Sequence, residues 1–403
     1  MITPFPDTVD FGENLWLSTR TKSIAEPVWP QDSRGVGNQI LVLRGTADML
    51  RDHRFHTLAV SAIVQETADT RTFILAIPND LADVFRYQAG QFCTFRAQIN
   101  GEEILRCYSM SSAPSVDHTL AVTVKRVAGG VMSNWLHDYV TVGDWLEVLK
   151  PSGVFTAHDG TDAIMALCGG SGVTPVFSLI KETLATTIRP ITMLYANRDR
   201  DSMIFASAFD ELVMRYPDRL KIQHHLDSES GYLTVGDVAH MFAERTDIDV
   251  YVCGPTPFMD IVEAGLAQAN VAPERIRIER FVNGGVATAL ADSQANAQAN
   301  ATDTIASGGD VTETLTIKLK GKKHHVTYIA GDTVLDAARR IGLKPPVSCE
   351  LGNCASCIAL VTTGSATLRA NNALSPAELA EGWILTCQAI PQGHTVVVEY
   401  EDL

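Results

Sequence analysis

The sequence predicts a multidomain chain in which a β part, an α/β part and an α+β part follow one another. Residues 57–151 contain short alternating stretches, such as "TLAVSAIV" and "QFCTFRAQI", separated by turn residues, which predicts an antiparallel β-barrel. From residue 162, apolar strands alternate with helical stretches, which predicts a parallel sheet covered on both faces. The last part begins with the hairpin "TLTIKLKGKKHHVTYI" and continues with a helix and a cluster of cysteines.

These changes of pattern divide the chain into five segments. We expect an N-terminal extension of unknown role at 1–56, a barrel at 57–157, an α/β domain at 158–281, a linker at 282–311 and a final domain at 312–403. The linker has no aromatic and no basic residue, which is typical of connecting segments, and both a mobile linker and a rigid docking are open. Two further helices are predicted, at "NQILVLRGTADMLRDHRF" and at "ATALADSQANAQA".

Composition excludes several classes of function. The net charge of -15 argues against nonspecific binding of nucleic acid and of anionic membrane surfaces. No run is apolar enough to span a bilayer, and the N-terminus lacks the pattern of a signal or transit peptide. We therefore expect a cytoplasmic protein in which structural disulfides are not favoured. We also expect it to be a monomer.

The stretch "CELGNCASC" places Cys349, Cys354 and Cys357 in a C-x4-C-x2-C pattern, and Cys387 follows in "ILTCQA". A zinc site is expected to have two closely spaced pairs of ligands, whereas here the fourth thiol stands alone. The spacing is that of a plant-type [2Fe–2S] cluster. Gly352 and the small residues around it suit a loop that wraps a cluster and turns its N–H groups toward sulfur. We also expect Cys387 at the start of a strand, and the helix "TVLDAARRIG" to be capped by Asp332.

Two features of the barrel suit a flavin. In "RCYSMSS", Arg106 and Tyr108 share one face of a strand end, where a guanidinium suits a pyrophosphate and a phenol suits an isoalloxazine ring, with Ser109 near the flavin edge. In "KRVAGGVMSNWL", Gly129 and Gly130 lead into a helix whose free N–H groups suit phosphate. Each feature alone more often has a purely structural role. The two together, on one barrel, indicate a flavin site much more strongly than either does alone.

The α/β part carries a nucleotide turn. "CGGSGVTP" follows a strand and opens a helix, which gives Gly170-x-Gly172 with Thr174 beyond. "CGPTPFM" ends a later strand of the same sheet, where ligands of doubly wound sheets sit, although Cys253 alone is more often a buried apolar-like residue. At the tip of "YANRDRDS", basic and hydroxyl groups suit a 2′-phosphate and acids suit a free ribose, so NADH and NADPH both stay open.

Taken in order, these motifs with "IERF" resemble the ferredoxin-reductase superfamily members that carry a C-terminal plant-type ferredoxin, the reductase components of oxygenases, and among them those of the 3-ketosteroid 9α-hydroxylase type. The resemblance covers about residues 57–403 and implies a FAD-binding antiparallel barrel, a parallel-sheet NAD-binding domain and a β-grasp ferredoxin. It implies catalytic contributions from Tyr108, Ser109, Thr174 and Cys253. Phe281 is expected near the flavin or at the end of the domain. The cofactor-binding residues that it implies are Arg106, Cys107, Tyr108, Ser109, Val124, Lys125, Gly130, Val131, Met132, Ser133, Gly170, Gly172, Thr174, Cys253, Gly254 and Pro255.

The expected function is an electron relay. Electrons pass from NADH, or NADPH, to FAD, to the [2Fe–2S] cluster held by the four cysteines, and to a partner oxygenase, expected to be Rieske-type and to act on a steroid or aromatic compound. A partner di-iron desaturase or epoxidase is the first alternative, and a redox-sensing iron–sulfur protein is the second. The electron-transfer component of a dihydroorotate dehydrogenase is disfavoured because its fourth cysteine follows at a much shorter interval.

Overall fold

The computed structural model of the chain describes residues 55–158, 160, 162–242, 247–281, 312 and 314–400. All described residues belong to one compact unit. The two helices predicted at "NQILVLRGTADMLRDHRF" and "ATALADSQANAQA", together with almost all of the extension and the linker, lie outside the described residues.

The first domain is an antiparallel barrel, as predicted. Its six strands run in the order β4-β3-β6-β1-β2-β5, and a bridge between Met110, just after β4, and Val122 of β5 joins the two ends of the sheet. The elements are β1 (His56–Thr67), β2 (Thr70–Ala76), β3 (Phe92–Ile99), β4 (Glu102–Ser109), β5 (Leu120–Lys125), α2 (Val131–Tyr139) and β6 (Trp145–Val148).

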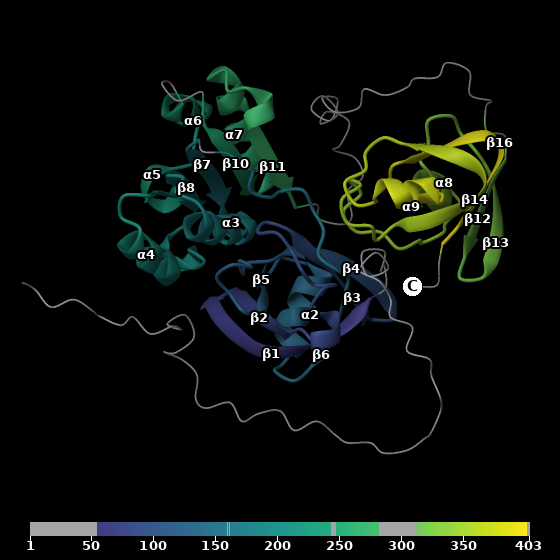
Figure 1. Cartoon of the computed structure of the whole chain (residues 1–403), viewed down its shortest axis with the longest axis horizontal. Coiled ribbons are helices and arrows are strands. Elements are labelled where there is room, and N and C mark those ends of the chain that lie inside the picture. Colours follow the sequence, from purple (N-terminus) through teal and green to yellow (C-terminus); the bar gives the residue numbers. More distant parts are fainter. Residues whose placement is uncertain are drawn as a thin grey trace, which may run out of the picture. The chain divides into compact units, whose positions relative to one another are not determined.

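Alternation explains how these strands build a core. Phe73 and Leu75 of β2 are 0 % and 1 % exposed and face the interior with Phe95 of β3. The helix α2 contributes Met132 and Leu136 to the same core, and Figure 1 shows it lying against the strands. Because α2 is held from inside, its first turn has a fixed position at the end of the barrel.

The second domain is a parallel sheet, as predicted, with strand order β11-β10-β7-β8-β9. Its strands are β7 (Ile164–Gly169), β8 (Ile191–Asn197), β9 (Leu220–Leu226), β10 (Asp249–Gly254) and β11 (Ile276–Arg280). Its helices are α3 (Val173–Thr186), α4 (Ala206–Arg215), α5 (Asp227–Ser230), α6 (Val235–Met241) and α7 (Thr256–Gln268). Short 3₁₀ turns occur at Asn79–Leu81 of the barrel and, here, at Gly170–Gly172, Arg200–Ser202 and Pro273–Arg275.

Helices cover both faces of this sheet. Tyr195 of β8 lies with Phe177 of α3 and Phe209 of α4, and the Tyr195 and Phe209 ring centroids are 5.9 Å apart. Leu167 of β7 belongs instead to a core that includes Val238 of α6 and residues of α7. Figure 1 shows α6 and α7 on the side of the sheet away from α3 and α4. The carboxyl ends of the strands are thereby left free for ligands.

The helix α3 also fixes the sheet to the barrel. Ser178 Oγ donates to the carbonyl of Ser112 at 2.5 Å, and Lys181 forms an ion pair with Asp117. Lys181 is 5 % exposed, and breaking such a buried pair from one side is strongly destabilising. These contacts bring the two predicted cofactor sites together.

The third domain has a five-stranded sheet in the order β13-β12-β16-β14-β15. The strands β12 and β16 are parallel and the other neighbours are antiparallel. The elements are β12 (Thr314–Leu319), β13 (Lys322–Thr327), α8 (Val334–Arg340), β14 (Ile358–Leu368), α9 (Pro376–Ala380), β15 (Trp383–Leu385) and β16 (Ala389–Glu399). This mixed sheet with a packed helix agrees with the predicted β-grasp domain.

Two local predictions in this domain were wrong. The helix α8 is capped by Thr333 and not by Asp332, because Thr333 and Asp336 form a reciprocal capping box. Cys387 does not start a strand: it lies in the turn between β15, which ends at Leu385, and β16, which begins at Ala389. None of the described helices is long and apolar enough to cross a membrane.

Candidate functional site

A cavity of about 660 Å³ lies where the end of the barrel meets the carboxyl ends of the parallel strands. Its walls come from β4, the end of β5, the first turn of α2, the nucleotide turn, the ends of β10 and β11, and the loop of the third domain that carries Cys349. The predicted site residues that line it are Arg106, Cys107, Tyr108, Ser109, Lys125, Gly130, Val131, Met132, Ser133, Thr174, Gly254, Pro255 and Cys349. Val124, Gly170, Gly172 and Cys253 are not among its lining residues.

The strand β4 supplies the barrel side of the cavity. The Tyr108 ring packs edge-on against Phe95 with ring centroids 5.6 Å apart, and burial raises the pKa of its phenol. Arg106 donates to the Leu105 carbonyl at 2.7 Å, which holds the guanidinium at the cavity wall. Cys107 Sγ lies 3.4 Å from Thr94 Oγ1 of the neighbouring strand. A flat ring and a fixed cation therefore lie side by side.

We expect Tyr108→Ala to weaken retention of FAD about tenfold, because loss of a stacking ring removes roughly 1 kcal/mol or more beyond the area that it buries. Flavin content after gel filtration and a fluorescence titration with FAD measure the effect. Tyr139→Ala is the matched control, since Tyr139 ends α2 and is 72 % exposed. Equal flavin content in both variants would remove Tyr108 from the site.

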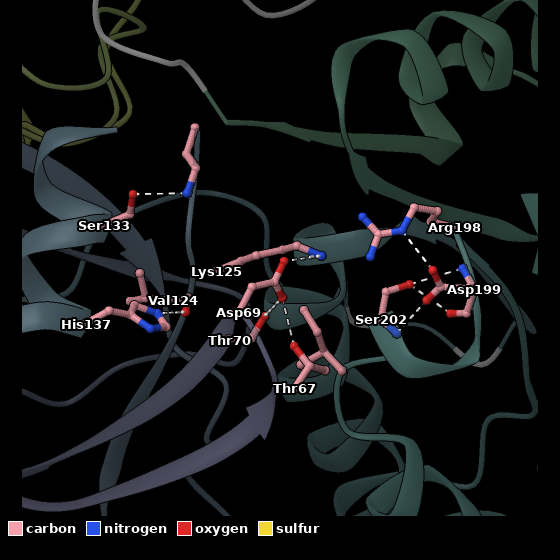
Figure 2. Close-up of polar contacts among 12 residues, drawn as sticks. Thr67, Asp69, Thr70, Val124, Lys125, Ser133, His137, Arg198, Asp199 and Ser202 are labelled. Carbon is pink, nitrogen blue, oxygen red and sulfur yellow. Dashed lines mark hydrogen bonds and ion pairs between the residues drawn. The ribbon is translucent and has the colours of Figure 1, made fainter. Parts of the chain in front are cut away.

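The first turn of α2 forms a cradle for an anion. Gly130 is its N-cap and no side chain caps the helix, so its first N–H groups are free for a ligand. Gly129 has φ +70°, and a Cβ on Gly130 would lie 2.6 Å from Ser133 Oγ. Ser133 Oγ in turn accepts a hydrogen bond from Val127 N at 3.2 Å; Figure 2 labels Ser133. The turn thus fits the phosphates of FAD.

The base of this wall is fixed by contacts with β5. His137 Nε2 lies 2.8 Å from the carbonyl of Val124 (Figure 2), which ties α2 to the strand. Val124 itself is 1 % exposed in the barrel core. Its contribution is therefore through the backbone, while the next residue, Lys125, faces the cavity.

An acid on the β1–β2 turn holds Lys125 in position. Lys125 Nζ lies 3.6 Å from Asp69, and Asp69 also accepts from Thr67 Oγ1 at 2.9 Å and Thr70 Oγ1 at 3.1 Å. Burial opposes ionisation of Asp69, but these hydrogen bonds and the lysine charge outweigh it, so the pKa of Asp69 is lowered. Figure 2 shows this group opposite Arg198 and Asp199 of the parallel sheet.

The nucleotide turn depends on a close approach of two backbones. Gly172 has φ −62°, yet a Cβ on it would lie 2.2 Å from the carbonyl oxygen of Cys253. Gly170 has φ +49°, which favours glycine. Thr174 Oγ1 donates to the Ser171 carbonyl at 3.1 Å. The turn therefore brings Ser171 and Thr174 to the cavity, while Gly172 packs against the backbone of Cys253 and Gly254.

Cys253 lies behind the cavity wall. Its side chain is 0 % exposed, and burial raises the pKa of its thiol. Its neighbours Gly254 and Pro255 line the cavity. A catalytic contribution from the Cys253 side chain stays a prediction, since the structure brings its backbone and not its thiol to the cavity edge.

An aspartate that is held by hydrogen bonds, Asp199, follows the end of β8. Asp199 caps the following 3₁₀ turn: it accepts from Ser202 N at 2.9 Å and from Arg198 Nε at 2.8 Å, as Figure 2 shows. Hydrogen bonds from Arg198 and Ser202 lower the pKa of Asp199. A permanent negative charge is thus fixed at the strand end where the second ribose of a dinucleotide binds.

The sequence interpretation missed Glu279 as a site residue. It lies on β11 opposite Cys253 in the ladder and lines the cavity with Arg280 and Phe281. Burial raises the pKa of Glu279 to about 8, so at neutral pH the group can donate a hydrogen bond or hold a proton. The usable signal was an acid within "IERF" at the carboxyl end of a strand.

We expect Glu279→Gln to change how stability depends on pH. The unfolded chain releases this proton near pH 4.5 and the folded chain near pH 8, so the folded state binds more protons in between and loses stability as pH rises. As the pH rises from 5 to 8, the free energy of unfolding of the variant should increase by about 1–2 kcal/mol relative to that of wild type. Above pH 8 this difference should not increase further. Thermal unfolding measures this, and Glu274→Gln, at an exposed position, is the control. Parallel curves for all three proteins would contradict the assignment.

The cluster cysteines of the third domain are arranged in two pairs. Cys357 Sγ lies 3.3 Å from Cys387 Sγ, and the thiols of Cys349 and Cys354 hydrogen-bond each other. Among the described residues, no three His, Cys, Asp or Glu side chains converge on one point as a mononuclear zinc site needs. Two thiolates for each of two irons is the arrangement of a [2Fe–2S] cluster.

Family models match all three domains. The oxidoreductase FAD-binding domain matches residues 57–156, the oxidoreductase NAD-binding domain residues 166–264, and the 2Fe-2S iron-sulfur cluster binding domain residues 317–392. The "3-ketosteroid-9-alpha-monooxygenase, ferredoxin reductase component" of Mycobacterium tuberculosis is 36% identical over 360 residues, 88% of this chain and 98% of the relative. The chain belongs to the ferredoxin reductase components of oxygenases.

Other members of this family match this chain over nearly their whole length. A component of the 1,2-phenylacetyl-CoA epoxidase of Escherichia coli is 31% identical, with 86% of this chain and 98% of the relative covered. The solved structure of phthalate dioxygenase reductase has a TM-score of 0.52 at 24% identity and covers 86% of this chain and 98% of that one, which shows the shared fold. This reductase therefore passes electrons from a nicotinamide coenzyme through FAD to a [2Fe–2S] cluster and on to an oxygenase.

Proposed function

We propose that this reductase serves a Rieske-type oxygenase that hydroxylates a steroid or an aromatic compound. The supporting observation is the likeness to the 3-ketosteroid-9-alpha-monooxygenase components, which are 35–37% identical over nearly their whole length. The relatives named for an epoxidase and for glycine betaine monooxygenase are 31% and 30% identical. A monomeric, cytoplasmic protein stays our prediction.

The roles of the site residues follow from their chemistry. FAD, when bound, accepts a hydride and releases electrons singly. In our proposal, Arg106 and the first turn of α2 bind its pyrophosphate, and Tyr108 packs on the isoalloxazine ring. Ser109 and Thr174 orient the two rings at their junction, where Gly254 and Pro255 exclude water. Positioning of this kind, and not acid–base catalysis, governs hydride transfer.

The preferred coenzyme in this proposal is NADH. Asp199 is fixed and ionised at the tip of β8 by Ser202 and Arg198. Since Arg198 is already paired with that carboxylate, a 2′-phosphate would meet a negative charge, whereas a free ribose can hydrogen-bond to it. We expect steady-state kcat/KM to favour NADH by at least about tenfold; a preference for NADPH would contradict the coenzyme assignment alone.

Reconstitution separates the classes of partner. The purified reductase is mixed with a Rieske-type steroid oxygenase or with a di-iron epoxidase, and coupled product formation is measured with NADH. We expect at least about tenfold faster turnover with the Rieske enzyme. Faster turnover with the di-iron enzyme would favour the alternative partner. Rapid reduction of cytochrome c by NADH in the same preparation argues against a purely sensing role.

A further inference from the structure

The strand β4 carries a thiol that points away from the face assigned to the flavin. Arg106 and Tyr108 share one face of the strand, so the side chain of Cys107 between them points to the other. Its partner in the ladder is Thr94 of β3. Thr94 is 1 % exposed, although by alternation it lies on the opposite side of β3 from Phe95, which packs in the barrel core. This outer face of the barrel is therefore covered.

The segment of the third domain that leads into the cluster loop lies against this face. Ser348 Oγ lies 3.1 Å from Cys107 Sγ, within hydrogen-bond reach. The thiol of Cys107 also hydrogen-bonds with that of Cys354, a cluster ligand. By contrast, the neighbouring thiol of Cys93 is enclosed in the barrel core, where it contacts Met110 at 3.6 Å. Cys107 thus joins the flavin-binding strand to the cluster site.

A second contact sets the direction in which the two segments lie. Lys344 Nζ lies 2.8 Å from Glu102 Oε1 at the start of β4, whereas Ser348 meets Cys107 near the end of the strand. Residues 344–348 therefore follow β4 in the direction of the strand. The side chains of the ion pair are 83 % and 63 % exposed, and such pairs contribute little to stability. The half-buried contact at Cys107 therefore carries more of the docking.

Cys107 lies between the cavity and one half of the cluster site. The cavity is lined by Cys107 and its two neighbours on the barrel side, and by Ser348 and Cys349 on the side of the third domain. Cys349 and Cys354 form one of the two pairs of cluster thiols. This pair is therefore the half of the cluster site that faces the flavin cavity.

We propose that Cys107 positions the third domain for electron transfer, because its contact with Ser348 seats the Cys349–Cys354 half of the cluster site against the strand that binds the flavin. In this step one electron leaves the reduced flavin and enters the oxidised cluster, and the thiol of Cys107 is neither oxidised nor reduced. A loosely seated domain spends a smaller fraction of time in the productive position, so transfer slows in proportion. Cys107 is thus a positioning residue for the known reaction.

The first test follows the two reductions separately in the holoprotein. After anaerobic stopped-flow mixing with NADH, the cluster of Cys107→Ala should be reduced about fivefold more slowly than that of wild type, because a side-chain hydrogen bond of the docked state is lost. Reduction of the flavin should stay within about twofold. Cys107→Ser, which keeps a hydrogen-bonding group, should behave like wild type. Cys93→Ala, at a core thiol of the neighbouring strand, is the matched control and should also behave like wild type.

A variant on the other side of the contact separates docking from flavin binding. Ser348→Ala leaves β4 intact and should slow reduction of the cluster by the same factor. The double variant Cys107→Ala, Ser348→Ala should be no slower than either single variant, because all three lack the same contact. FAD content, iron content and the midpoint potentials of both cofactors should equal those of wild type. A slower rate that comes with a changed midpoint potential would overturn the positioning role.

A chemical cross-link measures docking without turnover. Cysteines introduced at the exposed positions Glu102 and Lys344 are joined in the holoprotein by a short bismaleimide, and the cross-linked fraction is read from gel mobility and mass. Adding Cys107→Ala to the Glu102→Cys, Lys344→Cys protein should slow cross-linking about fivefold, and each single cysteine variant should give no internal cross-link. The proposal would be overturned by unchanged cross-linking, by reduction of the cluster at the wild-type rate in Cys107→Ala, or by equally slow reduction in the Ser and Ala variants.

Discussion

Replacing Cys387 with serine is expected to abolish the visible absorption of the cluster while reduction of the flavin by the coenzyme survives. The reason is the pairing of the thiols: Cys387, in the β15–β16 turn, lies 3.3 Å from Cys357, which immediately precedes β14. Its loss therefore leaves one iron without half of its protein ligands. The flavin and nucleotide residues belong to other domains with separate cores.

Two rates measured on one preparation test this expectation. Anaerobic flavin reduction should stay within about twofold of wild type, and electron delivery to the oxygenase should fall by on the order of 100-fold or more. Cys93→Ala is the matched control, because Cys93 is a buried thiol of the barrel core outside the cluster loop. Loss of flavin reduction in a folded Cys387→Ser protein would show that the modules are not independent.

Gly172→Ala is expected to have the second largest effect, on coenzyme use alone. The added Cβ would lie 2.2 Å from the Cys253 carbonyl oxygen and 2.5 Å from Gly254 N, and backbone atoms inside a sheet cannot move aside cheaply. The nucleotide turn must shift by about 1 Å, and a misplacement of that size costs on the order of 100-fold in rate.

Stopped-flow reduction of the flavin by NADH measures the loss, while FAD and iron content should remain at wild-type values. Gly236→Ala in α6 is the control, since its Cβ would meet only Thr234 Oγ1 at 3.8 Å. Wild-type rates in Gly172→Ala would mean that the turn does not hold the coenzyme.

Periodicity was sufficient to predict the architecture. The strands of the barrel and of the parallel sheet were predicted because their apolar residues alternate or run continuously, as in Phe73 and Leu75 of β2. The cap of α8 was misassigned although its signal was present: Thr333 followed by Asp336 is a capping box, and Asp332 only resembles a cap in isolation. The position of Cys387 was misassigned because β15 has only three residues.

The sequence predicted those site residues that belong to short local motifs. Arg106 and Tyr108 could be placed on one face because the strand period is two. Glu279 could not be recognised, since its burial depends on a cavity whose walls come from segments far apart in the chain. The burial of Cys253 behind Gly172 likewise depends on two backbones that meet only in the folded sheet.

The measurement that tests the central claim most directly is an anaerobic reductive titration of the purified reductase, with iron, acid-labile sulfide and FAD assayed on the same sample. The account predicts three electrons for each chain, two stored by the flavin and one by the cluster. Uptake of two electrons only, by a protein that holds zinc in place of iron and sulfide, would contradict it.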